Sequence, residues 1–310
     1  MRSWGEKPYH SLDYELKHRF GEKVYKLTLN GGMSCPNRDG KISFGGCIFC
    51  SEGGSGEFAS AACLSIPDQI QDAKKRLAGK RPVNQYIAYF QAYTNTYAPA
   101  ERLRELFEPV MKDERFAGIA IATRPDCLSE EVLDLLAEFN EKTFMWVELG
   151  LQTSNEETAE YIRRCYRNEV YEQAVQNLNA LDIPVITHVI LGLPGETKED
   201  MATTVRYAVD CGTWGIKLQL LHVLEGTDLG EQYKAQEAGT PLPGARPIRI
   251  MTLDEYTDLL CALLPLIPRD VVIHRITGDG PKRLLLAPLW SGDKKRVLNT
   301  INKAIRELKV

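Results

Sequence analysis

The chain has 310 residues, 44% of them hydrophobic, which is enough for one α/β barrel with additions and a large core. Its formal net charge of -4 argues against indiscriminate binding to nucleic acid. The eight cysteines show no paired spacing, no signal-peptide pattern follows Met1, and no apolar run has the length of a membrane span. We therefore expect a cytoplasmic protein with reduced thiols and no membrane contact.

Apolar, β-branched or aromatic runs recur along the chain and predict six strands. These runs cover residues 24–30, 85–90, 117–122, 144–151, 185–191 and 215–222. Helical patterns lie between most of them, with start signals at Pro67, Ser129, Thr197 and the capping box from Thr252 to Glu255. This alternation predicts an α/β fold in which helices cover the sides of parallel strands.

The polar motifs repeatedly fall at the carboxyl ends of the predicted strands. Barrel enzymes build their active sites there, so we favour a partial (βα)6 barrel of the TIM type over the alternative, a doubly wound sheet. In this interpretation, residues 1–23 form an N-terminal extension and 24–222 form the barrel. Residues 223–310 form a C-terminal extension with one more strand in VVIHRI.

Three cysteines, Cys35, Cys47 and Cys50, follow the first predicted strand in one loop. Three thiolates can hold three irons of a [4Fe-4S] cluster and leave the fourth iron open to a cofactor or substrate. The alternative is a structural zinc site in which Cys63 supplies the fourth ligand. The intervals of eleven residues and then two match neither a zinc finger nor a zinc ribbon, so the cluster is favoured.

Polar side chains near the ends of later strands outline a binding rim. The second strand runs into a polar segment that begins at Gln91. The fourth strand carries Glu148 and Gln152 on alternate positions, which should face the barrel interior. The fifth strand carries His188, although a lone histidine on a strand is more often a core residue than a catalyst.

Basic residues are concentrated near the end of the chain. Residues 274–310 contain nine Lys or Arg against three Asp or Glu, a net charge of +6. A second basic run, from Lys74 to Arg81, ends the first helix predicted after the cysteine loop. Each run taken alone is more often a solvated helix face than a binding surface.

Several longer strings resemble a single enzyme family. They include CPNRDG, GGCIFCSEGG, YFQAYTNTYAP, VELGLQT, HVILGLPGET and HRITGDGPKR. Together they are similar to the radical S-adenosylmethionine (radical SAM) enzymes of the YtqA/YhcC-like group, over nearly the whole chain. The resemblance implies the partial barrel of radical SAM enzymes, with a [4Fe-4S] cluster on the three cysteines of the loop. It also implies S-adenosylmethionine on the open iron, cleaved to a 5'-deoxyadenosyl radical that abstracts hydrogen from the substrate.

The resemblance also carries individual residues of the cofactor site. Glu148 and Gln152 match the polar positions that hold S-adenosylmethionine, and Arg164 matches an arginine on the following helix that meets its carboxylate. His188 matches a position beside the ribose and adenine. The family's usual GGE motif is absent after the second strand, so the segment that starts at Gln91 is left to recognise the methionine amino group.

The group looks related to the catalytic subunit of Elongator, and this resemblance suggests a tRNA substrate. Some members remove the carboxymethyl group from 5-carboxymethylaminomethyluridine at the wobble position and leave 5-aminomethyluridine. An electron donor such as flavodoxin or ferredoxin would then be a second partner. Two alternatives remain open: a radical SAM enzyme that acts on a small metabolite or a protein, and a zinc-containing, non-catalytic RNA-binding module.

Overall fold

The computed structural model of the protein describes residues 4–5, 7–54, 56–57, 59–77, 79 and 82–308. The first three residues of the predicted N-terminal extension lie outside the described residues. So do Lys80 and Arg81 of the first basic run, and Lys309 and Val310 of the second. None of the helices in the described part of the chain is long and apolar enough to cross a membrane.

Seven parallel strands form one curled sheet, in the order β1-β2-β3-β4-β5-β6-β8. They are β1 (Tyr25–Leu29), β2 (Tyr86–Phe90), β3 (Phe116–Thr123), β4 (Phe144–Gln152), β5 (Val185–Leu191), β6 (Gly215–Leu220) and β8 (Val272–Arg275). The strand order follows the chain without the reversal that a doubly wound sheet requires, so the partial barrel is confirmed. The seventh strand comes from VVIHRI, which the sequence predicted as a strand but did not place in the barrel sheet.

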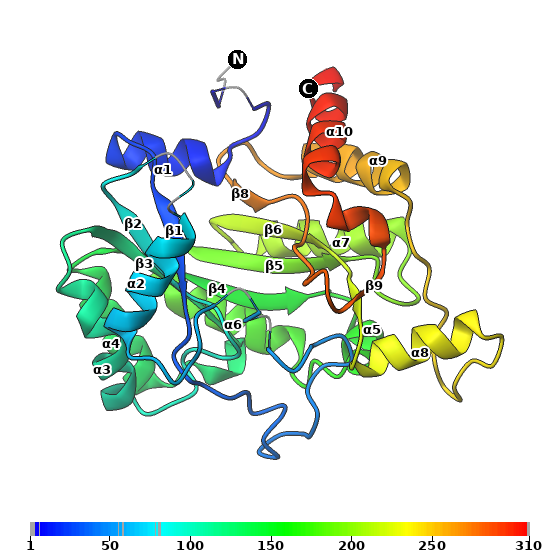
Figure 1. Ribbon diagram of the computed structural model, residues 1–310, viewed down its shortest axis with the longest axis horizontal. Helices are drawn as coiled ribbons and strands as arrows, with labels where there is room; N and C mark the ends of the chain where they lie inside the picture. Colours follow the sequence, from blue (N-terminus) through cyan, green and yellow to red (C-terminus); the bar gives the residue numbers. More distant parts are fainter. Residues whose placement is uncertain are drawn as a thin grey trace.

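Helices cover the outer face of the sheet (Figure 1). They are α2 (Ile66–Leu77), α3 (Ala100–Met111), α4 (Glu130–Asn140), α6 (Asn168–Ala180), α7 (Lys198–Asp210) and α9 (Leu253–Leu263), whereas the short α5 (Glu156–Tyr161) follows β4 outside this layer. The predicted start signals are confirmed: Ser129 caps α4, and Thr197 and Thr252 form capping boxes with Asp200 and Glu255. Their apolar faces and the sheet enclose the main core.

Both ends of the chain close the open side of the half-barrel. Helix α1 (Leu12–Phe20) packs Leu12 and Leu16 against inward-facing residues of the sheet, including Trp146 and Val272. Just before α1, Ser11 forms a parallel bridge with Ile273 of β8. Helix α10 (Lys294–Glu307) packs on α9 at the upper right of Figure 1, whereas α1 lies at the upper left.

The remaining elements of the C-terminal segment surround the carboxyl end of the barrel. They are α8 (Asp228–Glu237), the antiparallel pair β7 (Val223–Leu224) and β9 (Leu285–Ala287), and the 3-10 helix η3 (Leu289–Gly292). Two further 3-10 helices lie elsewhere: η1 (Pro125–Cys127) follows β3, and η2 (Leu264–Leu266) lies between α9 and β8. Ile48 of the cysteine loop packs with Val223, Leu229 and Ala287 in a separate apolar cluster. The C-terminal segment is thereby tied to the cysteine loop as well as to the sheet.

Candidate functional site

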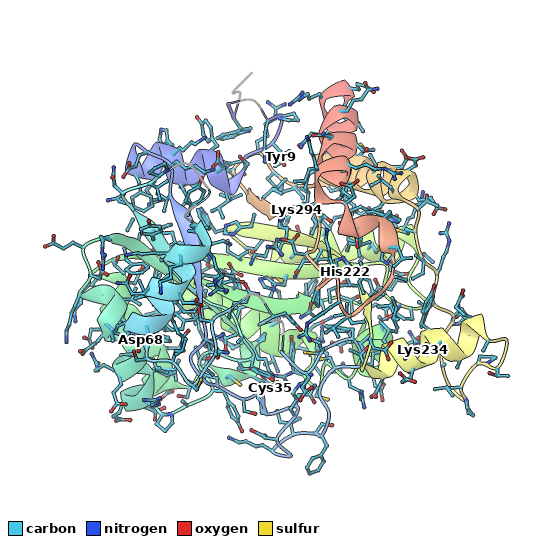
Figure 2. The ribbon with its side chains drawn as sticks, in the orientation of Figure 1. Tyr9, Cys35, Asp68, His222, Lys234 and Lys294 are labelled. Carbon is cyan, nitrogen blue, oxygen red and sulfur yellow. The ribbon has the colours of Figure 1, made fainter. Side chains whose placement is uncertain are left out.

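The three cysteines lie on one long loop at the carboxyl end of β1, and Figure 2 labels Cys35 below the strands. Two tight turns shape the loop around them. The backbone N–H of Arg38 donates to the carbonyl of Cys35 at 2.8 Å. The backbone N–H of Cys50 donates to the carbonyl of Cys47 at 3.0 Å. The thiols are carried by fixed turns, which is the arrangement that a cluster-binding loop requires.

Polar side chains anchor this loop to the rest of the barrel. Asn37 is fully buried and donates to the carbonyl of Arg163 at 2.6 Å and to the sulfur of Cys47 at 3.6 Å. Arg38 donates to the carbonyl of Cys50 at 2.6 Å. Because sulfur ligands of a cluster are tuned by hydrogen bonds to them, Asn37 would tune an iron if Cys47 binds one.

A close approach between this loop and the segment after β2 requires glycine. Gly54 has a φ of +56°, and a Cβ there would lie 2.2 Å from the ring of Tyr93. The carbonyl of Gly54 in turn accepts from the N–H of Tyr93 at 2.9 Å. Gly54 thus lets the cysteine loop pack directly on the segment after β2.

The thiols fit a cationic metal group better than they fit an empty loop. The pKa of Cys47 is raised to about 12, mainly by burial and also by the nearby Cys50 and Cys35, against the opposing charge of Arg124. Burial also raises the pKa of Cys50, against the opposing charge of Arg38. Coordination deprotonates such thiols, and the two arginines offset the negative charge of a thiolate-bound cluster.

The zinc alternative requires a different set of ligands. Cys63 is exposed in the turn before α2. Within the described ranges, no group of three or more His, Cys, Asp or Glu side chains is placed to hold a single metal ion. A four-iron cluster gives each thiolate its own iron, so its three cysteines need not converge on one point.

Buried acceptors without a partner gather at the carboxyl ends of the strands. Five buried side-chain oxygens in the described part of the chain accept no hydrogen bond, and four of them lie on the cysteine loop or just after β2, β4 and β5: Asn37, Asn95, Gln152 and Glu196. Buried polar atoms are normally satisfied, so these oxygens suit a ligand that brings donors. The amino group and ribose hydroxyls of S-adenosylmethionine are such donors.

Gln152 reaches this rim because β4 is irregular at its end. The pairing with β5 shifts between Gly150 and Gln152, and Gln152 adopts a φ of +67°. A non-glycine residue in this region is strained, and such strain is concentrated at functional sites. The simple alternation that the sequence predicted for Glu148 and Gln152 therefore breaks between them.

We expect Gln152→Ala to weaken S-adenosylmethionine binding roughly tenfold, the loss expected when one buried hydrogen bond to a charged group is removed. Calorimetric titration of cluster-loaded protein measures it. Gln173→Ala, on the outer surface of α6, serves as the control and should bind like the parent. Equal affinity in Gln152→Ala and the control would remove Gln152 from the cofactor site.

Arg164 is placed differently from the sequence expectation. It lies in the turn after α5 rather than on a helix, because α5 ends at Tyr161. Its side chain is 1% exposed and donates to the carbonyls of Leu151 at 3.1 Å and Thr153 at 2.7 Å. Arg164 thus holds the end of β4 in place, and a contact with the cofactor carboxylate stays a prediction.

Glu148 lies deep inside the barrel at the centre of a polar network. Its two carboxylate oxygens accept from Tyr89 at 2.7 Å, Trp146 at 3.0 Å and Lys217, and His188 lies 2.8 Å away. Glu148 itself is fully buried. Glu148 faces the barrel interior, as the sequence predicted, and the structure brings it together with His188 but saturates it with protein partners.

Burial and the neighbouring charges determine the protonation states of Glu148 and His188 at neutral pH. Burial acts to raise the pKa of Glu148, but Lys217 and Lys26 outweigh burial and hold the pKa well below its usual value. Burial and the charge of Lys217 lower the pKa of His188 to about 4. The network thus presents an ionised carboxylate and a neutral imidazole.

Sequence reasoning missed two members of this network, Lys26 and Tyr89. The ammonium of Lys26 lies 4.5 Å from the centroid of the Tyr89 ring, and the Tyr89 hydroxyl accepts from Lys217 at 2.9 Å. The available signal was a lysine in the middle of an apolar strand, in YKLTL and again in IKLQL. Gln91 lies at the end of β2, where its N–H donates to Leu29 at 3.3 Å, and its role in cofactor binding stays a prediction.

An α/β half-barrel with three cysteines in the loop after its first strand defines a radical SAM protein. The family model of the radical SAM superfamily matches residues 35–208, and the model of the radical SAM C-terminal domain matches residues 213–307. The chain belongs to the radical SAM superfamily. Members of this superfamily use a [4Fe-4S] cluster and S-adenosylmethionine, and these are the cofactors of this protein.

The chain is also similar to individual proteins. YtqA of Bacillus subtilis is 46% identical over 300 residues, which is 97% of this chain and 90% of YtqA. YhcC of Escherichia coli K12 is 35% identical over 294 residues, 94% of this chain and 91% of YhcC. A tRNA uridine(34) acetyltransferase of Dehalococcoides mccartyi is 29% identical over 182 residues, 56% of this chain and 36% of that protein.

Among solved structures, archaeal Elp3 of Methanocaldococcus infernus, with residues 1–46 deleted, has a similar fold. It aligns with a TM-score of 0.62 and 18% identity. The alignment covers 90% of this chain and 63% of that structure. At this identity the likeness concerns the fold alone.

Proposed function

We propose that the protein modifies tRNA in the cytoplasm, removing the carboxymethyl group from 5-carboxymethylaminomethyluridine at the wobble position to leave 5-aminomethyluridine. The bound cluster and S-adenosylmethionine supply the radical that abstracts hydrogen from the substrate. The reducing electron comes from a donor such as flavodoxin or ferredoxin. The chain's own contribution is to bind both cofactors and to position the uridine.

The basic face of α10 is the observation that carries the tRNA substrate. Lys295, Arg296, Lys303 and Arg306 are exposed, while Val297, Ile301 and Ile305 face the core. The four cations form no ion pair with a carboxylate in the part of the chain that the structure describes. Unpaired cations along one helix face suit contacts to phosphates, which position an RNA without reading its sequence.

Similarity to known proteins also supports a tRNA substrate. The relative from Dehalococcoides mccartyi is a tRNA uridine(34) acetyltransferase, and its similarity covers 56% of this chain. The archaeal Elp3 structure shares the fold. In our proposal, the segment 223–310 supplies the tRNA-contacting region through α10.

The residues of the barrel have separate tasks in this proposal. Cys35, Cys47 and Cys50 hold the cluster, and the unpaired oxygen of Gln152 accepts from the bound cofactor. Helix α1 covers the inner face of the sheet and keeps water from it. A protected interior is needed because a radical would otherwise react with the wrong partner.

Nucleoside analysis tests the function directly. A strain that lacks this gene should accumulate 5-carboxymethylaminomethyluridine in its tRNA and lose the nucleosides derived from 5-aminomethyluridine. Complementation with the parent protein should restore the normal pattern, and complementation with Cys35→Ala should not. Cys63→Ala provides the matched control, since its thiol is exposed and outside the proposed ligand set. An unchanged tRNA nucleoside profile in the deletion strain would contradict the tRNA substrate and favour a small metabolite or a protein as substrate.

A further inference from the structure

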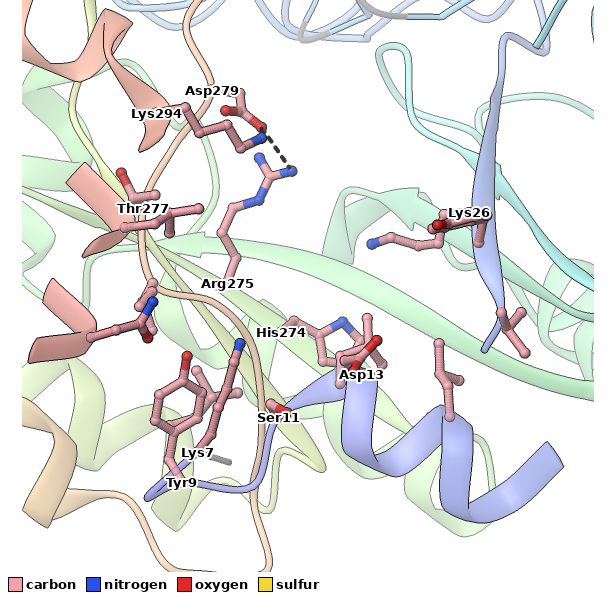
Figure 3. Close-up of a pocket in the computed structure, with 18 residues that line it drawn as sticks. Lys7, Tyr9, Ser11, Asp13, Lys26, His274, Arg275, Thr277, Asp279 and Lys294 are labelled. Atoms are coloured by element: carbon pink, nitrogen blue, oxygen red, sulfur yellow. Dashed lines mark hydrogen bonds and ion pairs between the residues drawn. The ribbon is translucent and has the colours of Figure 1, made fainter. Parts of the chain in front are cut away.

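A cavity of about 340 Å³ opens at the seam between β1 and β8, the two edges of the sheet. Its walls come from the segment before α1, from α1 itself, and from β1, β8 and α10 (Figure 3). We call it the seam cavity. Tyr9 and Lys294, which line it, lie above the strands in Figure 2, whereas Cys35 lies below them. The seam cavity is therefore separate from the cluster loop, and its volume is that of a small-ligand site.

Positive charge dominates the lining of the seam cavity. Four cations and two carboxylates contribute to it, namely Lys7, Lys26, Arg275, Lys294, Asp13 and Asp279. The carboxylates already have partners: Asp279 is shared by Lys294 at 2.8 Å and Arg275 at 3.6 Å, and Asp13 pairs with Lys17 at 2.8 Å and with Lys23. Two positive charges are therefore left over.

Lys7 and Lys26 are the two lining cations that lack a direct carboxylate partner in the described part of the chain. Burial lowers the pKa of both lysines, because the nearby carboxylates, Asp13 for Lys7 and Glu148 for Lys26, offset only part of their loss of hydration. In Figure 3, both side chains extend into the space between β1 and β8. A bound anion would supply the missing partner.

Other lining groups offer further ligand contacts. Both ring nitrogens of His274 are buried and have no hydrogen-bond partner within the described ranges. A neutral imidazole carries one donor and one acceptor, so His274 can still bind a polar group. Tyr9 adds an aromatic ring that is 8% exposed. Such a combination of cations, one imidazole and an aromatic ring suits an anionic group attached to a planar one.

We propose that the seam cavity binds a phosphate-bearing ligand of nucleotide size, with Lys7, Lys26 and Arg275 as its phosphate contacts. Phosphate matches this set because its several oxygens can meet three cations at once, one of them a guanidinium fork. The phosphate belongs either to a nucleotide of an RNA strand or to a free nucleotide. The RNA source rests on the proposed function, while the cavity itself does not.

Lys26 connects the seam cavity to the barrel interior. Its ammonium lies over the ring of Tyr89, whose hydroxyl donates to Glu148 at 2.7 Å. A phosphate held by Lys26 therefore sits next to the network of Glu148, Lys217 and His188. The nucleoside attached to that phosphate is directed along the seam, between β1 and β8.

Calorimetric titration of the cluster-loaded protein with inorganic phosphate and with uridine monophosphate tests the proposal. Both should bind the parent, the nucleotide more tightly. Lys26→Gln and Arg275→Gln should each bind the nucleotide about tenfold or more weakly, because a charge-assisted contact is lost. Lys26→Arg keeps the charge and should retain most of the affinity. Lys112→Gln, at an exposed lysine beyond α3, is the surface control.

Folding is checked separately, since Lys26 and Arg275 lie near buried groups. Lys7→Gln changes a residue in the segment before α1 and leaves the barrel strands untouched, so its loss of nucleotide affinity cannot be attributed to an unfolded barrel. Parent protein that binds neither phosphate nor the nucleotide would overturn the seam cavity as a phosphate site. So would variants at all three positions that bind both ligands as the parent does.

The salt dependence of tRNA binding distinguishes a nucleotide of an RNA strand from a free nucleotide as the ligand. If the cavity takes a nucleotide of an RNA strand, Lys26→Gln lowers the logarithmic salt slope of tRNA binding by roughly 0.7 to 0.9. If it takes a free nucleotide, the slope stays at the parent value while affinity for uridine monophosphate falls. Either result supports the phosphate site. A failed nucleoside analysis with intact binding of uridine monophosphate would remove the proposed function and leave the cavity assignment standing.

Discussion

Replacing Cys35, Cys47 or Cys50 by Ala is expected to abolish assembly of the [4Fe-4S] cluster. Each thiolate binds a separate iron, so the loss of any one leaves two irons without a protein ligand. After anaerobic reconstitution, the parent should hold about four irons per chain and absorb visible light as a brown protein. Each of the three variants should lose both properties.

Cys63→Ala is the matched control for the cluster ligands, because its thiol is exposed in the turn before α2. It should keep the iron content and the absorbance of the parent. A second control, Asn37→Ala, removes the hydrogen bond to the sulfur of Cys47 and should keep the iron while shifting the reduction potential. Loss of metal in Cys63→Ala, with iron retained in Cys35→Ala, would contradict this ligand set.

Glu148→Ala is expected to destabilise the metal-free protein by about 3 to 5 kcal/mol, the cost of breaking a buried ion pair from one side. The substitution leaves Lys217 inside the barrel without a carboxylate, next to Lys26. The midpoint of urea unfolding, followed by circular dichroism, measures the effect. Glu138→Ala is the control, since Glu138 pairs with Arg104 on the surface and its loss should change the midpoint far less.

The difference in stability between the parent and Glu148→Ala should depend on pH, in a direction set by the pKa of Glu148. The pKa of Glu148 is lowered in the folded protein, so its stabilisation is present above the unfolded pKa of about 4.3 and is lost as pH falls through the folded value. The gap between the parent and Glu148→Ala should therefore narrow in acid. A gap that widened below pH 4 would contradict an ionised Glu148 in the folded state.

Local sequence patterns were sufficient to predict the strands of the sheet and the starts of several helices. Residues 185–191 were predicted as a strand and form β5 over the same range, because a continuous β-branched run buried on both faces has few alternatives. The capping box from Thr252 to Glu255 and the helix start at Thr197 were predicted from short stretches of sequence and are confirmed. These features depend only on neighbours in the chain.

Features set by tertiary contacts were not predictable in the same way. The irregular end of β4 at Gln152 depends on the pairing with β5, which the sequence of β4 alone does not specify. Arg164 was expected on a helix, but α5 has six residues and stops before it. Lys26 and Tyr89 stand on different strands from Glu148, so their network is visible only when the sheet is curled.

The seam between β1 and β8 has a consequence for biosynthesis. The N–H of Ile273 donates to the carbonyl of His10 at 2.7 Å, and His10 also contacts Asp270, 260 residues along the chain. The segment before α1 therefore gains these partners only after Asp270 and Ile273 have been synthesised. Contacts of such long sequence separation form late, since the loop between them must first be closed. The open side of the barrel is therefore completed only after β8 has joined the sheet, and until then the inward-facing residues that α1 covers are accessible to chaperones.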